Sequence, residues 1–352
     1  MERTVTELVI WAQSICRSTM ALYREVKRLA GVPVTVIVRR NERGESAQKI
    51  REAQGQGASE FADVVDVEWD GGLKSGQDIL AEHSVPRTVH VFSGYQVSQA
   101  VRALMQMAHE RGSRVAVYDE APSEMCVGVK ALLKRIYYRW FLPCRVRDAV
   151  KCADLFLNAS GRKGVGRLVR LGWDRKKIVP FGYASEVSSA FKARNPESIK
   201  ALRILHTGIE TPYRDVATLR KAVSILERKG ISVEVACTGG SVSPEELNRF
   251  YDWADVFVAC GFCEPWGMRV NDAIHSGLPV FVSSGMGVEW LVEQYGCGGV
   301  FHKGSAQDLA NLLERYITDG AFRTKALSGV SAAHEAWTPA NKAKDFLEKA
   351  YS

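Results

Sequence analysis

Residues 253–280 have the sequence Trp253-Ala-Asp-Val-Phe-Val-Ala-Cys-Gly-Phe-Cys-Glu-Pro-Trp-Gly-Met-Arg-Val-Asn-Asp-Ala-Ile-His-Ser-Gly-Leu-Pro-Val280. A short apolar run is followed by an acid, Glu264, and then by a helical pattern that begins at Gly267. The start of a helix leaves backbone N–H groups without partners and carries the positive end of the helix dipole. The stretch therefore predicts a site for a phosphate or diphosphate, flanked by two carboxylates, Glu264 and Asp272, that suit hydroxyl recognition.

The same alternation of apolar runs and amphipathic helices extends in both directions. In the first half we expect strands at Leu8–Trp11, Val34–Val38, Val64–Val67, Val89–Phe92, Val115–Tyr118 and Leu155–Leu157, with helices such as Thr19–Leu29 and Gln96–Arg111. In the second half we expect strands at Leu202–Thr207, Val233–Ala236, Val256–Ala259 and Pro279–Val282, with helices at Asp215–Lys229 and Gly267–Ser276. Parallel sheets with crossover helices produce this pattern. We predict an α/β fold of two doubly wound, Rossmann-like domains that face each other across a cleft.

The overall composition fits a globular protein of two domains. The chain has 352 residues, 46% of them hydrophobic and 25% charged, and a single domain is usually smaller. The first residues lack the pattern of a signal peptide, and no stretch approaches the roughly 20 apolar residues that span a bilayer. The eight cysteines are scattered, and Cys260-Gly-Phe-Cys263 has no second ligand pair, so we expect a cytoplasmic chain without a bound metal.

The net charge of +7 is concentrated in one stretch, from Lys130 to Lys151. Apolar and aromatic residues alternate there with basic ones, and Asp148 is the only acid. Such a helix suits an anionic lipid interface, with Lys134, Arg135, Arg139 and Trp140 as candidate contacts. A helix packed on its own domain with a solvated basic face is an equal alternative. Nucleic acid is disfavoured because no binding motif accompanies the charge.

Several common motifs are absent. The chain has no G-x-G-x-x-G, no G-x-x-x-x-G-K-[ST] and no G-x-S-x-G sequence, which argues against hydride transfer, ATP hydrolysis and a hydrolase of the nucleophile-elbow type. His90, His206 and His275 stand in apolar surroundings, so we expect them to be core residues and not catalytic ones.

The 253–280 stretch resembles the retaining glycosyltransferases of family 4, which have the GT-B fold. Their signature is an E-P-F-G run with a second acid, the E-x7-E motif, followed by G-x-P-V; this chain has Glu264-Pro-Trp-Gly267, Asp272 and Gly277-Leu-Pro-Val280. The resemblance continues at Val89–Phe92, Lys177–Gly182 and Leu202–Leu219. It implies an acceptor domain of residues 1–184, a nucleotide-sugar domain of residues 185–337, and a terminal helix, 338–352, that crosses back to the first domain.

The resemblance also implies roles for individual residues. Glu264 would contact the transferred sugar, Asp272 the ribose hydroxyls, and Arg214 the leaving phosphate. The N–H groups of Trp266, Gly267 and Met268 would hold the diphosphate, and Gly208 and Gly239 are further candidates on the donor side. Charge on the departing nucleoside diphosphate would be stabilised by these groups, with no cofactor or metal. Asp119 is a candidate catalytic residue, and Gln13 and Glu120 are candidates for acceptor binding, because parallel sheets bind ligands at their strand ends.

Three departures from the family pattern matter for function. Asp272 stands where the family has Glu, Ile209 where it has an Arg next to Gly208, and Tyr118 where it has a His. The segment between Val233 and Trp253 is also shortened. The main expectation is transfer of a sugar, with retention, from a nucleotide sugar to a saccharide or lipid-linked acceptor in bacterial surface polysaccharide or lipopolysaccharide assembly. The alternatives are a non-catalytic subunit that binds a partner glycosyltransferase and a nucleotide-sugar epimerase.

Overall fold

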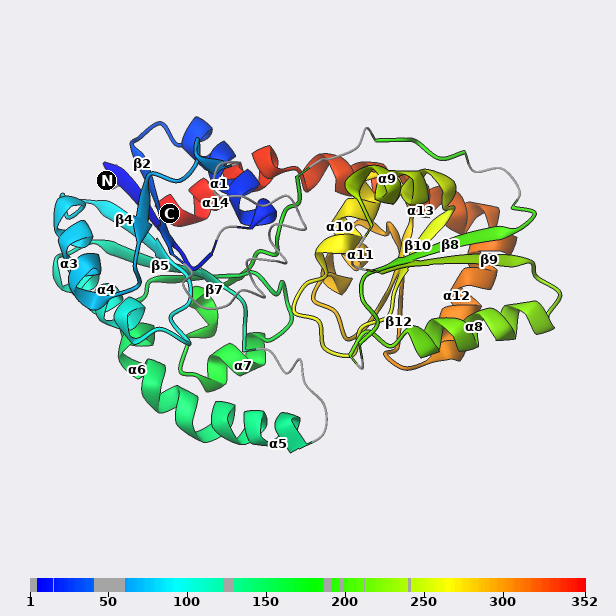
Figure 1. Ribbon diagram of the computed structural model, residues 1–352, viewed down its shortest axis with the longest axis horizontal. Coiled ribbons are helices and arrows are strands. Elements are labelled where there is room, and N and C mark those ends of the chain that lie inside the picture. Colours follow the sequence, from blue (N-terminus) through cyan, green and yellow to red (C-terminus); the bar gives the residue numbers. More distant parts are fainter. Residues whose placement is uncertain are drawn as a thin grey trace. The chain divides into compact units, whose positions relative to one another are not determined.

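The computed structural model describes residues 5–14, 16–40, 61–122, 129–186, 191–195, 199–211, 213–239 and 242–352 (Figure 1). The chain forms two compact units. Unit 1 comprises Met1–Pro122, Leu132–Ala184 and Pro339–Ser352, and unit 2 comprises Ser123–Ala131 and Ser185–Thr338. The terminal helix, α14 (Pro339–Tyr351), therefore returns to the first unit, as the resemblance implied.

Unit 1 is built on a seven-stranded parallel sheet with the strand order β3-β2-β1-β4-β5-β6-β7. Its strands are β1 (Glu7–Ala12), β2 (Val34–Arg39), β3 (Val67–Trp69), β4 (Thr88–Phe92), β5 (Arg114–Asp119), β6 (Leu155–Asn158) and β7 (Ile178–Pro180). Its helical segments are α1 (Arg17–Leu29), α3 (Leu73–Glu82), α4 (Gln99–Glu110), the greater part of α5 (Val129–Ile136, from Leu132 onward), a π-helix (Tyr137–Phe141), α6 (Leu142–Cys152), α7 (Val165–Arg170) and a 3-10 turn (Arg175–Lys177).

Alternate residues of each strand of unit 1 enter opposite layers of the core. Leu8 and Ile10 of β1 pack in one cluster with α1 and α14, whereas Val9 and Trp11 pack in a second cluster with α4 and α6. Successive side chains of a strand point to opposite faces of the sheet, so a strand covered on both faces is apolar throughout. This is why the strands appear in the sequence as continuous apolar runs.

Unit 2 has a five-stranded parallel sheet with the strand order β12-β11-β10-β8-β9. Its strands are β8 (Leu202–Thr207), β9 (Val233–Thr238), β10 (Val256–Ala259), β11 (Val280–Ser283) and β12 (Gly298–Phe301). Its helices are α8 (Val216–Arg228), α9 (Pro244–Trp253), α10 (Met268–His275), α11 (Glu289–Tyr295), α12 (Ala306–Thr318) and α13 (Gly320–Ala336). Helices α8 and α12 pack together on β8 and β10.

Two strand expectations need correction. Residues 64–67 were expected to form a strand, but Val64 lies in a turn closed by its N–H bond to the Phe61 carbonyl oxygen at 2.9 Å, and β3 begins only at Val67. Strand β12 was not expected, because two of its four residues are glycines, which have low strand propensity. Gly298 is required there, since its φ is 152° and a Cβ atom would lie 1.9 Å from the Val280 carbonyl oxygen.

In the described part of the chain, no helix combines the length and the apolar character that a membrane crossing requires.

All strand pairs in both sheets are parallel. The carboxyl ends of parallel strands meet at one edge of a sheet, where doubly wound proteins bind their ligands. For unit 2 this edge follows Thr207, Thr238 and Ala259. We therefore expect the ligand-binding residues of unit 2 to lie at this edge.

Two glycines of unit 2 provide a matched test of packing. Gly277 and Gly230 have φ values of 84° and 78°, but a Cβ atom at Gly277 would lie 2.0 Å from the Lys192 carbonyl oxygen, whereas nothing lies within 4 Å of one at Gly230. We expect Gly230→Ala to lower the free energy of unfolding by about 1 kcal/mol, from backbone strain alone. Gly277→Ala should cost about 3 kcal/mol because a backbone clash is added. Urea denaturation measures both; equal losses would contradict the tight approach of residue 192.

Candidate functional site

The loop from β10 to α10 is held by backbone hydrogen bonds to its neighbours. The Gly287 N–H donates to the Glu264 carbonyl oxygen at 3.1 Å, and the Val288 N–H donates to the Trp266 carbonyl oxygen at 3.2 Å. Gly267 has a φ of 120°, and a Cβ atom there would lie 2.6 Å from Cε of Met286. Only glycine fits this position, so the helix that begins at Met268 starts at a fixed place.

The Trp266 side chain anchors the same loop in the core. Its ring is buried and stacks on Trp337 with ring centroids 5.9 Å apart, and its Nε1 donates to Oδ1 of Asn271 at 3.0 Å. The Trp266 side chain is thus occupied by core contacts, and only the backbone N–H remains for the donor-binding role that the resemblance implies.

Arg269, in the first turn of α10, was missed by the sequence analysis. Its Nη2 donates to Oε2 of Glu264 at 3.0 Å, with side-chain exposures of only 10% for Arg269 and 14% for Glu264. Its Nη1 donates to the Thr207 carbonyl oxygen at the end of β8 at 2.5 Å. Burial lowers the pKa of Arg269, and the charge of Glu264 opposes that shift. An arginine five residues after the acid is a signal that could have been noticed, but helical spacing alone does not pair these positions.

Arg214 lies close to Arg269, beside Gly208. A Cβ atom at Gly208 would lie 2.6 Å from Nη1 of Arg214 and 3.1 Å from Nη1 of Arg269, and the φ of Gly208 is 105°. Nη1 of Arg214 donates to the Ile209 carbonyl oxygen at 3.2 Å. Gly208 is thus needed for both guanidinium groups to reach the end of β8.

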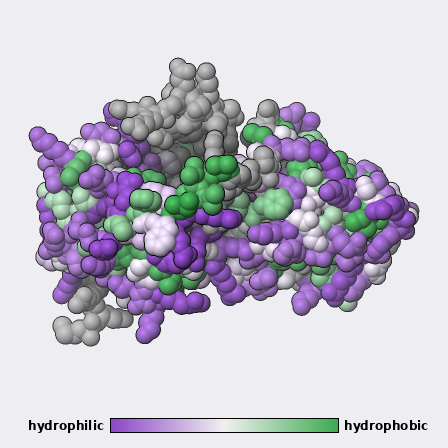
Figure 2. Space-filling model, turned by 90° about the horizontal axis from the view of Figure 1, so that it is seen from below, coloured by the Kyte–Doolittle hydropathy of each residue, from purple (hydrophilic) through white to green (hydrophobic). Residues whose placement is uncertain are grey.

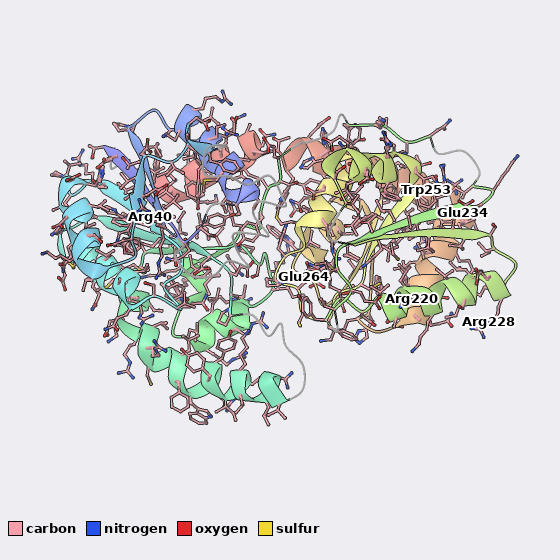
Figure 3. The ribbon with its side chains drawn as sticks, in the orientation of Figure 1. Arg40, Arg220, Arg228, Glu234, Trp253 and Glu264 are labelled. Carbon is pink, nitrogen blue, oxygen red and sulfur yellow. The ribbon has the colours of Figure 1, made fainter. Side chains whose placement is uncertain are left out.

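Two cations gathered at the start of a helix favour an anionic ligand. The Nε atoms of Arg214 and Arg269 are buried and have no hydrogen-bond partner in the structure. The first N–H groups of α10, beginning at Met268, have no acceptor within the helix. A phosphate group would provide acceptors for all of these donors and a counter-charge for the two arginines. Figure 3 shows Glu264 at this end of the unit 2 sheet, away from Glu234 near the start of β9.

Asp272 lies on the second turn of α10 and is half-buried. Loss of water around its carboxyl group raises the pKa to about 6, although hydrogen bonding to Ser185 opposes the shift. Asp272 also raises the pKa of the buried Tyr251 by its charge, after burial itself. A carboxyl group that titrates near neutral pH can either donate to or accept from a hydroxyl group.

Gly239 directly follows β9, and the end of β9 is hydrogen-bonded to the end of β8. The Gly208 N–H donates to the Thr238 carbonyl oxygen at 2.9 Å, and a Cβ atom at Gly239 would meet nothing within 4 Å. Gly208 and Gly239 therefore lie at the same edge of the sheet as Arg214 and Arg269.

In unit 1, Asp119 ends β5 and accepts two backbone hydrogen bonds. Its Oδ2 accepts from the Gly94 N–H at 2.9 Å and its Oδ1 from the Glu120 N–H at 2.8 Å. Burial raises the pKa of Asp119 to about 6, against the effect of these two bonds. The Tyr183 hydroxyl donates to Oε1 of Glu120 at 3.3 Å. The Asp119 carboxylate joins the ends of β4 and β5, which gives it a structural role in addition to the predicted functional one.

Gln13 lies at the same edge of the unit 1 sheet. Its backbone N–H donates to Oγ of Ser93 at 3.0 Å, its Nε2 donates to the Ser93 carbonyl oxygen at 3.1 Å, and its Oε1 accepts from Nη1 of Arg39 at 3.3 Å. A Cβ atom at Gly94 would lie 2.2 Å from the Gln13 side chain. Gln13 and Asp119, one predicted acceptor residue and one predicted catalytic residue, therefore both contact Gly94, and Glu120 follows Asp119 directly.

Tyr118 and the three histidines are buried. The Tyr118 hydroxyl donates to the Gly182 carbonyl oxygen at 3.1 Å. Nδ1 of His206 lies 2.8 Å from the Val258 carbonyl oxygen, and burial lowers the His206 pKa to about 4. Burial also lowers the pKa of His90 to about 3 and that of His275 to about 4. These imidazoles are neutral core groups at pH 7.

The four membrane-surface candidates lie together on a different part of unit 1. Lys134 and Arg135 belong to α5, and Arg139 and Trp140 to the π-helix that follows. Lys134 is half-buried and the other three are exposed.

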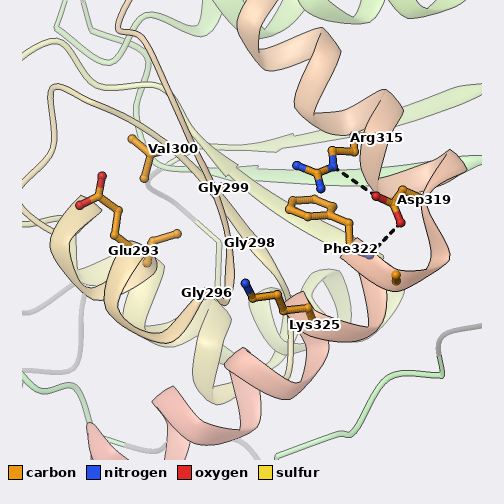
Figure 4. Close-up of a pocket in the computed structure, with 11 residues that line it drawn as sticks. Glu293, Gly296, Gly298, Gly299, Val300, Arg315, Asp319, Phe322 and Lys325 are labelled. Carbon is orange, nitrogen blue, oxygen red and sulfur yellow. Dashed lines mark hydrogen bonds and ion pairs between the residues drawn. The ribbon is translucent and has the colours of Figure 1, made fainter.

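A cavity of about 570 Å³ lies elsewhere in unit 2 (Figure 4). Its lining includes Gly298 and Gly299, at the amino end of β12, together with Arg315, Phe322 and Lys325. The strands are parallel, so the cavity lies at the amino-terminal edge of the sheet, whereas Glu264 lies at the carboxyl-terminal edge. The cavity contains none of the predicted site residues, and doubly wound sheets bind ligands at the other edge.

Part of unit 2 matches a known protein family. Residues 214–328 match the family model described as "Glycosyl transferases group 1", and this segment contains Arg214, Glu264, Arg269 and Asp272. A search of curated proteins finds no match.

Solved structures with low sequence identity share the fold over nearly the whole chain. Anabaena Alr3699/HepE in complex with UDP has a TM-score of 0.64 and 13% identity, covering 98% of this chain and 99% of that one. The lipopolysaccharide outer core galactosyltransferase WaaB has a TM-score of 0.64 and 11% identity, with the same coverage. The structure described as "Trehalose-6-phosphate from E. coli bound with UDP-2-fluoro glucose" has a TM-score of 0.66 and 9% identity, covering 99% of each chain. The chain thus has the GT-B fold with two Rossmann-like domains, and the matches together support a glycosyltransferase.

The raised pKa of Asp272 predicts a stability change with pH. Its carboxyl group titrates near 3.8 when unperturbed and near 6 in the folded protein, so the folded state favours the protonated form. The corresponding stabilisation is complete below pH 4 and is lost as the pH rises through 6. We expect Asp272→Asn to be more stable than the parent protein by about 2 kcal/mol at pH 8 and equally stable at pH 4. Urea denaturation at both pH values tests this, and a gap that does not change with pH would contradict it.

Proposed function

We propose that the protein is a retaining glycosyltransferase that moves a sugar from a nucleoside diphosphate sugar to a saccharide or lipid-linked acceptor. The observation that carries the proposal is the arrangement of Arg214, Arg269 and Glu264 around the start of α10. Two guanidinium groups with buried, unpartnered Nε atoms fit a diphosphate, and the adjacent carboxylate of Glu264 fits the hydroxyl groups of the sugar attached to it.

The proposed reaction depends on stabilising the leaving group. The bond between the sugar C1 and the diphosphate oxygen breaks, the acceptor oxygen forms the new bond on the same face, and the acceptor proton passes to the departing phosphate. Negative charge that develops on the nucleoside diphosphate is met by Arg214, Arg269 and the first N–H groups of α10. Asp272 contacts the ribose hydroxyls. We propose that no metal or cofactor takes part, because Arg214, Arg269 and the helix N–H groups supply the positive charge that a metal ion would otherwise provide.

The acceptor is proposed to bind to unit 1 beside Gln13, Asp119 and Glu120. The hydrogen bonds around Gly94 already fix Gln13 and Asp119, so an incoming hydroxyl group would meet a rigid set of polar groups. The sugar is proposed to become part of a bacterial surface polysaccharide or lipopolysaccharide. The similarity of fold to the galactosyltransferase WaaB supports this proposal.

One observation favours a second candidate, a non-catalytic subunit of the same fold that binds a partner glycosyltransferase. Oε2 of Glu264 is paired with Arg269, and a carboxylate held in this way has less capacity to contact a sugar. Calorimetric titration with UDP-, GDP- and dTDP-sugars distinguishes the candidates. Binding accompanied by slow donor hydrolysis supports the enzyme, and no binding favours the subunit.

We expect Glu264→Gln to lower the rate of sugar transfer and donor hydrolysis about 10²- to 10³-fold. The Gln amide oxygen can still accept from Arg269, which keeps this buried arginine paired and the loop in place. UDP affinity should therefore change less than about threefold, measured by calorimetry. Glu293→Gln, at the opposite edge of the sheet, is the control and should leave the rate unchanged. Undiminished turnover of Glu264→Gln would refute the assignment.

The proposed role of Arg269 in phosphate binding can be tested by removing its guanidinium group and then introducing another one at residue 209. Arg269→Met should weaken UDP binding about 10- to 100-fold, the usual contribution of a hydrogen bond to a charged group. Uridine, which has no phosphate, should bind both proteins equally. Ile209 is exposed and adjacent to Gly208, so Ile209→Arg combined with Arg269→Met should restore much of the UDP affinity. If the affinities for UDP and uridine fall together, Arg269 has a structural role only.

A further inference from the structure

A stripe of exposed apolar side chains runs along the helix formed by α5 and the π-helix of unit 1. Its members are Leu132, Leu133, Ile136, Trp140 and Phe141, with exposed fractions of 58%, 60%, 44%, 64% and 59%. Monomeric globular proteins rarely expose so many large apolar residues in one place. The stripe therefore requires a partner surface.

The π-helix keeps the stripe continuous. In an α-helix, residues three and four apart share a face, as do Leu132, Leu133 and Ile136. A π-helix pairs residues five apart, so Phe141 follows Ile136 on the same face, next to Trp140. The adjoining residues of α6 that are buried, among them Leu142 and Val146, pack in the core of unit 1. Of the described side chains in the segment before α6, only the half-buried Tyr137 and Tyr138 pack against this core, so the stripe residues face the solvent.

Basic residues border the stripe along its whole length. Between Leu132 and Lys151 the sequence has six Lys and Arg residues and one acid, Asp148. The guanidinium carbon of Arg139 lies 5.4 Å from the Trp140 ring centroid, and Nζ of Lys134 lies 5.7 Å from that of Tyr138. Figure 2, which views the molecule from the side on which α5 lies in Figure 1, shows a hydrophobic group set among hydrophilic surface.

We propose that this stripe docks on an anionic lipid bilayer. Apolar and aromatic side chains would enter the boundary between headgroups and acyl chains, while the flanking Lys and Arg residues meet the phosphate groups. An anionic lipid surface is favoured over a protein partner because the segment carries six Lys and Arg residues and one acid, and such a surface attracts every one of these cations. The proposal is independent of sugar transfer and requires no donor.

Co-sedimentation of the full chain with lipid vesicles tests the proposal. We expect binding to vesicles of phosphatidylcholine mixed with phosphatidylglycerol and much weaker binding to phosphatidylcholine alone. Charge reversal by Arg135→Glu with Arg139→Glu should weaken binding to the anionic vesicles about thirtyfold or more. Replacing the aromatic pair, by Trp140→Ser with Phe141→Ser, should weaken binding to a similar degree without loss of charge. All four side chains are exposed, so these variants are expected to fold.

The matched control is Lys221→Glu with Arg228→Glu, which changes the net charge equally on exposed positions of α8. This control should bind anionic vesicles as the parent protein does. Failure of the parent protein to sediment with anionic vesicles, or equal binding by all the variants, would overturn the proposal. Equal loss in the control would also overturn it, because net charge and not the stripe would then govern binding. Self-association without vesicles that the aromatic variant abolishes would instead assign the stripe to a second copy of the chain.

Discussion

Every strand of both sheets runs in the same direction as its neighbours, and this constraint governs where chemistry can occur. Parallel strands need a crossover after each strand, so all the strand ends of one kind meet at one edge. In unit 2 that edge brings together Gly208 after β8, Gly239 after β9 and Glu264 after β10, which are more than 50 residues apart at the extremes. In unit 1 it brings Gln13, Gly94 and Asp119 together. Neither group of residues is contiguous in the sequence.

The buried ion pair between Glu264 and Arg269 adds charge to this arrangement. Burying an arginine is unfavourable unless acceptors surround it, and Arg269 finds one in Glu264 and another in the Thr207 carbonyl oxygen. Its Nε remains unpartnered, as does that of Arg214. An apo site that retains unsatisfied cationic donors is prepared for an anion, because the desolvation cost of the arginines has been met during folding. Glycine at 208 is the steric condition for this pairing.

The exposed stripe of α5 and the π-helix also raises the question of which surface its apolar side chains are buried against. Tyr137 and Tyr138 of the π-helix pack against the core of unit 1, whereas the exposed apolar side chains of the stripe add nothing to that core. Membrane docking would give them a function, and under the proposed sugar transfer it would bring the chain to the membrane in which a lipid-linked acceptor would be held.

The sequence by itself predicted the α/β fold and an anion site at Glu264-Pro-Trp-Gly267, because hydrophobic periodicity and helix-start chemistry are local properties. The return of the terminal helix was expected from the family resemblance and not from any local pattern. Tertiary structure alone decided the rest. It paired Arg269 with Glu264, since the partner carbonyl oxygen belongs to a strand 62 residues away, and it formed β12 from a glycine-rich segment through its approach to β11. It also left Leu132 to Phe141 exposed. Periodicity predicts that apolar residues share a helix face, but whether that face meets the core or the solvent depends on what packs against it.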